Sequence, residues 1–92
     1  MPAYRLRIDK PAERQVRRLP GHVRQRFRRL INSLAAEPRP QGAKRLRGYD
    51  HAYRIRIDIW RLVYLVDDVE RTVIVLGVRR KTGPETYEDI SE

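Results

Sequence analysis

Arginines suited to binding an anion are the most chemically informative residues of this sequence. Arg54 and Arg56 alternate with apolar residues, and Arg61 follows after a short break. We expect Asp58 and Ile59 to form a two-residue hairpin turn, which fixes the register of the strands on either side. Arg56 then lies directly across from Arg61, where two like charges destabilise a sheet. An anion bound between them would turn this repulsion into binding, so the spacing predicts a site for a phosphate or a carboxylate.

A second group of basic residues, Arg79–Lys81, follows the last predicted strand. We expect the chain to deliver this group to the end of the sheet that carries Arg61, with Gly77 nearby to let a ligand approach the backbone. Lys81 is the better proton carrier of the group, because arginine rarely surrenders its proton. The alternative interpretation is that these bases form only the solvated face of a sheet.

The composition restricts both the kind of protein and the kind of partner. The chain has 92 residues, enough for a single domain spanning 1–92, and no cysteine for a disulfide or a thiolate site. Its formal net charge is +9, and residues 1–50 hold fourteen basic and four acidic side chains. Such asymmetry favours a polyanion or an acidic protein as the partner. No apolar run reaches the roughly 20 residues of a membrane span, so we expect a cytoplasmic domain without a membrane partner.

The pattern of apolar residues predicts the elements that position these bases. Apolar residues at alternate positions predict strands, and apolar residues at helical spacing predict helices. The predicted strands are 4–8, 53–57, 60–66 and 72–78, and the predicted helices are 10–19, with Asp9 as N-cap, and 22–36. Between residues 37 and 51 we expect a polar loop anchored by Leu46. The order β-α-α-β-β-β indicates an α+β fold, in which two helices pack on one face of a small, mainly antiparallel sheet.

The two faces of the predicted hairpin differ in chemistry. One face carries apolar and aromatic side chains and is expected to meet the core: Tyr53, Ile55, Ile57, Trp60, Leu62 and Tyr64. The other face carries Arg54, Arg56 and Arg61. We therefore expect the basic site on the face opposite the core.

Several of these segments resemble the RelE/ParE family of prokaryotic toxins. The matching segments are Tyr53–Ile57, Trp60–Tyr64, Arg79–Lys81 with the later Tyr87, and the upstream basic segment Lys44–Gly48. With the length and the element order, they extend the resemblance over nearly the whole chain. The resemblance implies the RelE-like fold of microbial ribonuclease-type toxins. It also implies a type II toxin that is neutralised by an acidic RelB-like antitoxin in a hetero-oligomeric complex.

For the RelE branch, the resemblance implies an mRNA endonuclease, or mRNA interferase, that acts in the ribosomal A site. Cleavage there uses the 2′-hydroxyl of the RNA as the nucleophile, leaves a cyclic phosphate, and needs neither a metal nor a cofactor. Arg61 stands where the family has an arginine that holds the scissile phosphate. Arg54 and Arg56 stand where this branch often has lysines, and arginines are poor general bases.

The resemblance also implies roles for the segment after the last strand. Arg80 or Lys81 matches the basic residue near the leaving 5′-oxygen, and Tyr87 matches a tyrosine that positions or stacks the base. Further contacts to RNA or the ribosome are expected from Lys44, Arg45, Arg47 and Arg79.

Two other functions fit the same residues. The first is that of the ParE branch, which has the same fold but poisons DNA gyrase by protein contact. The second is a basic RNA- or ribosome-binding module that blocks translation sterically, without cutting RNA. Tyr87 and the arginines of the hairpin favour the RNA-cleaving branch, and the missing lysines weaken that preference.

Overall fold

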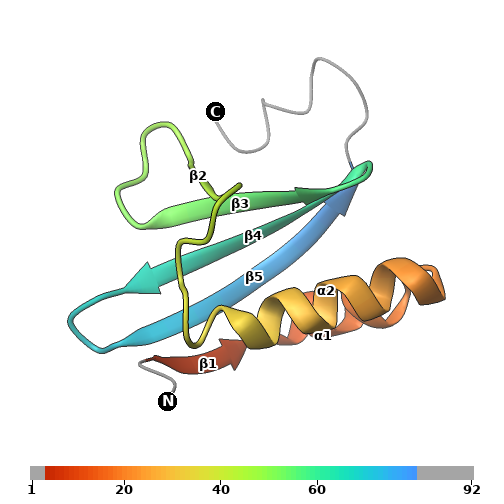
Figure 1. The fold of residues 1–92 in the computed structure, drawn as a ribbon, viewed down its shortest axis with the longest axis horizontal. Helices are drawn as coiled ribbons and strands as arrows, with labels where there is room; N and C mark the ends of the chain where they lie inside the picture. Colours follow the sequence, from red (N-terminus) through yellow and green to blue (C-terminus); the bar gives the residue numbers. More distant parts are fainter. Residues whose placement is uncertain (1–3, 81–92) are drawn as a thin grey trace.

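Five strands and two helices make up the part of the chain that the structure describes. The structure is a computed structural model, and it describes residues 4–80. The elements are β1 (Arg5–Ile8), α1 (Lys10–Arg17), α2 (Gly21–Ser33), β2 (Lys44–Arg45), β3 (Ala52–Ile57), β4 (Trp60–Asp67) and β5 (Thr72–Arg80) (Figure 1). The predicted order of strands and helices is confirmed, and β2 is an additional strand within the segment predicted as a loop. None of the helices between residues 4 and 80 is long and apolar enough to cross a membrane.

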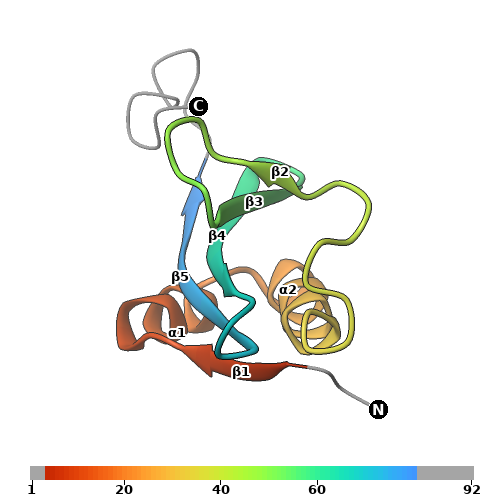
Figure 2. The same ribbon diagram turned by 90° about the vertical axis from the view of Figure 1, so that its left-hand side faces the viewer.

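The strands form one mixed sheet in the order β1-β5-β4-β3-β2. β1 runs parallel to β5, whereas every other neighbouring pair is antiparallel. A parallel pair requires a long crossover connection, and here the two helices and the three middle strands provide it. Figure 2 shows both helices near β1 and away from β2. The α+β fold class with a mainly antiparallel sheet is therefore confirmed.

The helices bury the predicted apolar stripes, but their ends differ from the prediction. Asp9 occupies the N-cap position of α1, yet its side chain makes no capping hydrogen bond. The Asp9 carbonyl instead accepts a 3.0 Å hydrogen bond from the N–H of Glu13. α2 begins at Gly21 and ends at Ser33, before the predicted end at Ala36. Beyond Ser33, the N–H of Ala36 donates a hydrogen bond to the Ser33 carbonyl. This three-residue spacing is typical of a 3₁₀ turn, which is tighter than an α-helical turn.

The main core lies between the helices and one face of the sheet. Phe27 of α2 and two residues of β4, Leu62 and Tyr64, are completely buried in it. The Tyr64 hydroxyl donates a 2.7 Å hydrogen bond to the carbonyl of Pro38, so this buried polar group is satisfied. The predicted core face of the hairpin is confirmed, because the remaining members also contact this core: Tyr53, Ile55, Ile57 and Trp60.

The opposite face of the sheet carries a second, smaller apolar cluster. Leu46, Ala52 and Val63 are buried in it, and Leu65 and Leu76 pack against them. The cluster exists because the middle of β4 is apolar at successive positions, so both faces of this strand favour burial. The prediction of Leu46 as an anchor is confirmed, although the sequence pattern did not indicate the rest of the cluster.

Candidate functional site

Three arginines form a row across the sheet. Arg56 of β3 pairs with Arg61 of β4, as the predicted turn requires. Arg61 in turn pairs with Arg79 of β5. Directly paired residues point to the same face of a sheet, so the three side chains share the face opposite the main core. We call Arg56, Arg61 and Arg79 the arginine row.

The next row along the same strands carries less charge. Arg54 pairs with Val63, and Val63 pairs with Gly77. Lys44 of β2 pairs with Arg54, so it lies on this face as well. Gly77, which was expected near Arg61, lies one row along the sheet from it. The reason is the β4–β5 register, which contains a one-residue shift and places Gly77 across from Val63.

The charges of this face are crowded and partly removed from water. The Arg61 side chain is buried, at 2% exposure, whereas Arg56 and Arg79 are exposed. Arg54 is half-buried; this burial lowers the pKa of its guanidinium, and the positive charge of Arg56 lowers it further. Like charges in a region of reduced water content attract an anion more strongly than the same charges in bulk water. The arrangement is therefore suited to a phosphate group.

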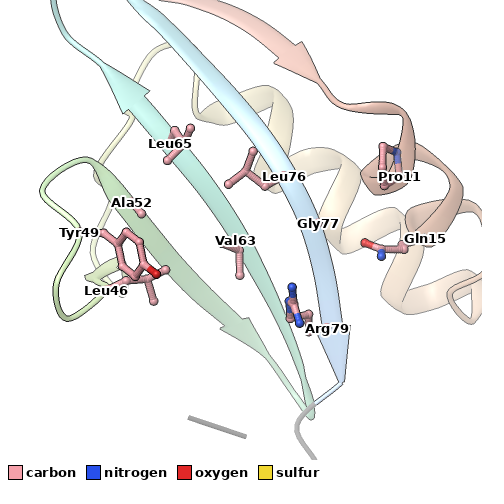
Figure 3. Close-up of a pocket in the computed structure, with 10 residues that line it drawn as sticks. All are labelled: Pro11, Gln15, Leu46, Tyr49, Ala52, Val63, Leu65, Leu76, Gly77 and Arg79. Carbon is pink, nitrogen blue, oxygen red and sulfur yellow. The ribbon is translucent and has the colours of Figure 1, made fainter. Parts of the chain in front are cut away.

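A groove of about 410 Å³ lies on this face of the sheet (Figure 3). Apolar side chains of three strands line it: Ala52, Val63, Leu65 and Leu76. Figure 3 shows Tyr49, in the loop between β2 and β3, on one side of the groove and Gln15 of α1 on the other. Arg79 also lines the groove, so the groove adjoins the arginine row.

Gln15 joins α1 to the last part of β5. Its side-chain oxygen Oε1 accepts a 2.7 Å hydrogen bond from the N–H of Val78. β1 pairs with β5 only as far as Val75, so Gln15 supplies a bond where the sheet has no further strand partner. A Cβ atom at Gly77 would lie 2.9 Å from the same oxygen. The lack of a side chain at Gly77 therefore makes room for Gln15 of α1, and Gly77 also lines the groove.

Arg80 does not join the arginine row. It pairs with Trp60, whose side chain packs against the main core, so Arg80 points to the opposite face from Arg61. The expectation that the bases after the last predicted strand all converge with Arg61 is therefore wrong for Arg80. β5 was predicted to end at Val78, but it continues through Arg80, and its side chains still alternate between the two faces.

The other predicted RNA-binding residues are also divided between the faces. Arg45 pairs with Tyr53 and so points toward the main-core side, whereas its neighbour Lys44 lies on the side of the sheet that carries the groove. Arg47 is exposed in the loop that follows β2. Lys81 and Tyr87, predicted as catalytic, lie outside the described residues.

The exposed aromatic ring of the groove, Tyr49, and its amide side chain, Gln15, were not predicted as site residues. Tyr49 has a detectable signal, since it is an aromatic residue within a polar segment, and its side chain is 52% exposed. Gln15 has no such signal, because a polar residue on the outer face of an amphipathic helix is ordinary. Within residues 4–80, no cluster of histidine, aspartate or glutamate side chains has an arrangement that could hold a metal ion.

Comparison with known proteins agrees with this architecture. The family model for ParE toxins of type II toxin–antitoxin systems, parDE, matches residues 6–82. The mRNA interferase toxin RelE of Escherichia coli is 32% identical over 89 residues, which cover 95% of this chain and 93% of that protein. The crystal structure of isolated E. coli RelE has a TM-score of 0.76 at 30% identity and covers 95% of this chain and 94% of its own. A chain from the crystal structure of the intact E. coli RelBE toxin–antitoxin complex has a TM-score of 0.73 at 32% identity, and the match covers 89% of this chain and 100% of that chain.

The extent of these matches decides the family. The family model covers most of the chain, and the E. coli relative is matched over nearly its whole length. The solved structures share the two helices and the mixed sheet that carry the groove. The chain therefore belongs to the ParE toxin family, within the RelE/ParE superfamily of type II toxin–antitoxin systems.

Proposed function

We propose that this toxin is a ribosome-dependent mRNA endonuclease, an mRNA interferase that inhibits translation. The arginine row beside the groove carries the proposal, because guanidinium groups gathered on one face match the oxygens of an RNA phosphodiester. The name of the E. coli relative, mRNA interferase toxin RelE, supports the same activity.

The proposed reaction is an internal transesterification of the RNA. The 2′-oxygen of one nucleotide attacks the adjacent phosphorus, and the bond from phosphorus to the 5′-oxygen breaks. A base takes the proton of the 2′-hydroxyl, an acid gives a proton to the leaving 5′-oxygen, and the products are a 2′,3′-cyclic phosphate and a 5′-hydroxyl. Because the RNA supplies the nucleophile and the arginines balance the developing charge, the proposed mechanism requires no metal or cofactor.

The proposed roles follow the positions of the arginines. Arg61 holds the scissile phosphate, and Arg54 and Arg56 stabilise charge near the 2′-oxygen. Arg79 lies directly across from Arg61, so we assign it the place beside the leaving oxygen that the resemblance implied for Arg80 or Lys81. Preorganised cations of this kind are worth several kcal/mol in a transition state.

Two assignments fall on residues outside the described range and remain proposals from the sequence. Lys81 is the proposed proton carrier, since a lysine surrenders its proton far more readily than an arginine. Tyr87 is the proposed stacking partner of a base. Both follow from the resemblance to RelE toxins.

The proposed partners are an acidic antitoxin and the ribosome. A RelB-like antitoxin would neutralise the toxin in a hetero-oligomer, and the solved RelBE complex of E. coli supports this partner. Lys44, Arg45 and Arg47 would contact ribosomal RNA or mRNA through phosphates, which provide salt-dependent affinity. We place this action in the cytoplasm, where translating ribosomes are.

The test is to add the purified toxin to translating ribosomes and to map the 5′ ends of the message. We expect new ends with the wild-type toxin and a roughly 10²- to 10³-fold slower cleavage with Arg61→Ala, because a preorganised charge stabiliser is lost. Arg29→Ala, which removes an exposed arginine of α2, is the charge-matched control and should cleave normally. Arrest of translation without new ends would instead identify a toxin that only binds and blocks the ribosome.

Inhibition of DNA gyrase by protein contact is the second candidate function. The observation in its favour is that the matching family model describes ParE toxins. A gyrase supercoiling reaction with the same protein preparation separates the two candidates. Cleaved message with unaffected supercoiling supports the endonuclease, and inhibited supercoiling with intact message supports the gyrase inhibitor.

A further inference from the structure

We propose that the apolar part of the groove is a nucleobase pocket, in which one unpaired RNA base beside the cleaved bond stacks against Tyr49. This inference rests on the proposed function and adds a base-binding subsite to the phosphate-binding arginine row. The occupant of the pocket is the base of the nucleotide whose phosphate lies on that row.

The groove matches the two chemical halves of a nucleotide. Its charged end carries Arg79 next to Arg61, and its floor is apolar. Val63, on this floor, lies two residues along β4 from Arg61, about 7 Å at roughly 3.3 Å per residue. This distance is within the span of one nucleotide, so a phosphate on the arginine row would bring its own base over the apolar floor. The groove volume of about 410 Å³ lies within the range of small-molecule sites, about 300–1,000 Å³.

Tyr49 is positioned to form one wall of this pocket. Among residues 4–80, the large apolar side chains that stay exposed are Tyr49, Ile59 and Val69, and Tyr49 is the one that lines the groove. The loop that carries it is held at both ends. The N–H of Tyr49 donates to the carbonyl of Leu46 at 3.2 Å, and the N–H of Leu46 donates to the carbonyl of Ala52 at 2.9 Å. An exposed ring on an anchored loop offers a stacking surface at a low cost in conformational entropy.

The opposite side of the groove offers a polar group for the edge of the base. The Oε1 atom of Gln15 accepts a hydrogen bond from the N–H of Val78, so the Nε2 atom of the same amide retains its donors. Gln15 lines the groove on the side opposite Tyr49 (Figure 3). A flat apolar floor, an aromatic wall and a single amide donor provide the stacking surface and the edge contact that a heterocyclic base requires.

The experiment compares two short RNA probes that cannot be cleaved. Both are 2′-O-methyl trinucleotides, one with adenine at the middle position and one abasic there, and their binding to the full-length toxin is measured by fluorescence anisotropy. We expect Tyr49→Ala to weaken binding of the adenine probe about tenfold or more, since stacking on an aromatic residue has this magnitude, and to leave the abasic probe unchanged. Tyr49→Phe should restore the affinity, because it keeps the ring. Val69→Ala removes an exposed apolar side chain outside the groove and is the matched control.

Methyl resonances identify where the probe binds. We expect the Leu65 and Leu76 methyl groups to shift with the adenine probe and not with the abasic probe, because only a base places an aromatic ring over them. Equal weakening of both probes by Tyr49→Ala, or unshifted methyl groups, would overturn the pocket. A shift of these methyl groups with a glutamate-rich peptide, but with neither RNA, would also overturn it and assign the groove to a protein partner.

The same measurements separate this inference from the proposed function. Base-dependent binding by a protein that leaves messages intact on ribosomes would keep the pocket and reject the endonuclease. Cleavage on ribosomes together with base-independent binding would keep the endonuclease and reject the pocket.

Discussion

Arg79 and Arg80 are adjacent in the sequence and equal in charge, yet the fold gives them different surroundings. Arg79 pairs with Arg61 and lines the groove, whereas Arg80 pairs with Trp60 on the opposite face. The charge of the two side chains is therefore the same, and what distinguishes them is the face of the sheet on which each lies. This contrast makes them a matched pair for mutation.

We expect Arg79→Ala to slow mRNA cleavage on ribosomes on the order of 10²-fold, and Arg80→Ala to slow it far less. The reason is that only Arg79 can contact a phosphate held by Arg61, and a charge stabiliser contributes through contact with the reacting group. Single-turnover cleavage rates of the two variants check the prediction. Equal losses would show that the net charge of this end of the sheet matters, rather than the row.

The residues of the site could be predicted where a short turn fixes them. The pairing of Arg56 with Arg61 follows from the two residues of the turn, Asp58 and Ile59, and Asp58 adopts a φ of 56° that aspartate tolerates. The side of the sheet that receives Arg79 could not be predicted in the same way. The face on which Arg79 lies depends on the register between β4 and β5 far from the turn that joins them. Sequence patterns carry little information about the register at such a distance from a turn.

At the scale of elements, the end of β5 depends on α1. β1 ends before this part of β5, and the Gln15 amide bonds the N–H of Val78 in the position where a strand partner would lie. No periodic pattern marks such a contact, because it joins a helix side chain to the backbone of a strand 63 residues away. For the same reason the short strand β2 was not predicted: two polar residues in a loop become a strand only by pairing with β3.

We expect Gln15→Ala to destabilise the fold by about 1 kcal/mol and to speed hydrogen exchange at the Val78 amide, since that N–H loses its acceptor. Gly77→Ala should have a similar effect, because the new Cβ would displace the same amide oxygen. The double variant should then lose little more than either single variant. Urea unfolding and amide exchange provide the measurements.

Gln25→Ala is the control for this prediction, because Gln25 is an exposed glutamine on α2. It should change neither the stability nor the exchange at Val78. Additive losses in the Gln15 and Gly77 double variant would show that the two residues do not act through one hydrogen bond.

At the scale of the whole molecule, Asp68 ties together segments that are distant in the sequence. Its carboxylate accepts 2.5 Å hydrogen bonds from the Tyr4 hydroxyl, before β1, and from the Arg39 guanidinium, after α2. Arg39 also donates to the Tyr53 hydroxyl at 2.9 Å. The Tyr4 and Arg39 hydrogen bonds lower the pKa of Asp68 below its ordinary 3.8.

The hydrogen bonds of the Asp68 carboxylate predict that the stability of the fold depends on pH. A carboxyl with a lowered pKa in the folded state stabilises the fold above its unfolded value, and the contribution disappears as the pH falls through the folded value. We therefore expect Asp68→Asn to be less stable than the wild type near neutral pH, with the difference shrinking as the pH falls below 3.8 and vanishing below the lower pKa of the folded state. Urea midpoints measured from acid to neutral pH test this, with exposed Asp50→Asn as the charge-matched control. A difference that persists in acid would contradict the assignment to the ionised carboxylate.

The single-residue irregularity between β4 and β5 determines which arginine of β5 joins the arginine row. On the far side of the irregularity Tyr64 pairs with Val75, whereas on the near side Arg61 pairs with Arg79. An unbroken ladder with the Tyr64–Val75 pairing would place Val78 across from Arg61 and would turn Arg79 toward the helices. Counting residues from one family member to another therefore cannot identify the arginine that lies across from Arg61. Gain or loss of this bulge during evolution would exchange the faces of the two neighbouring arginines without any change in the sequence of β5.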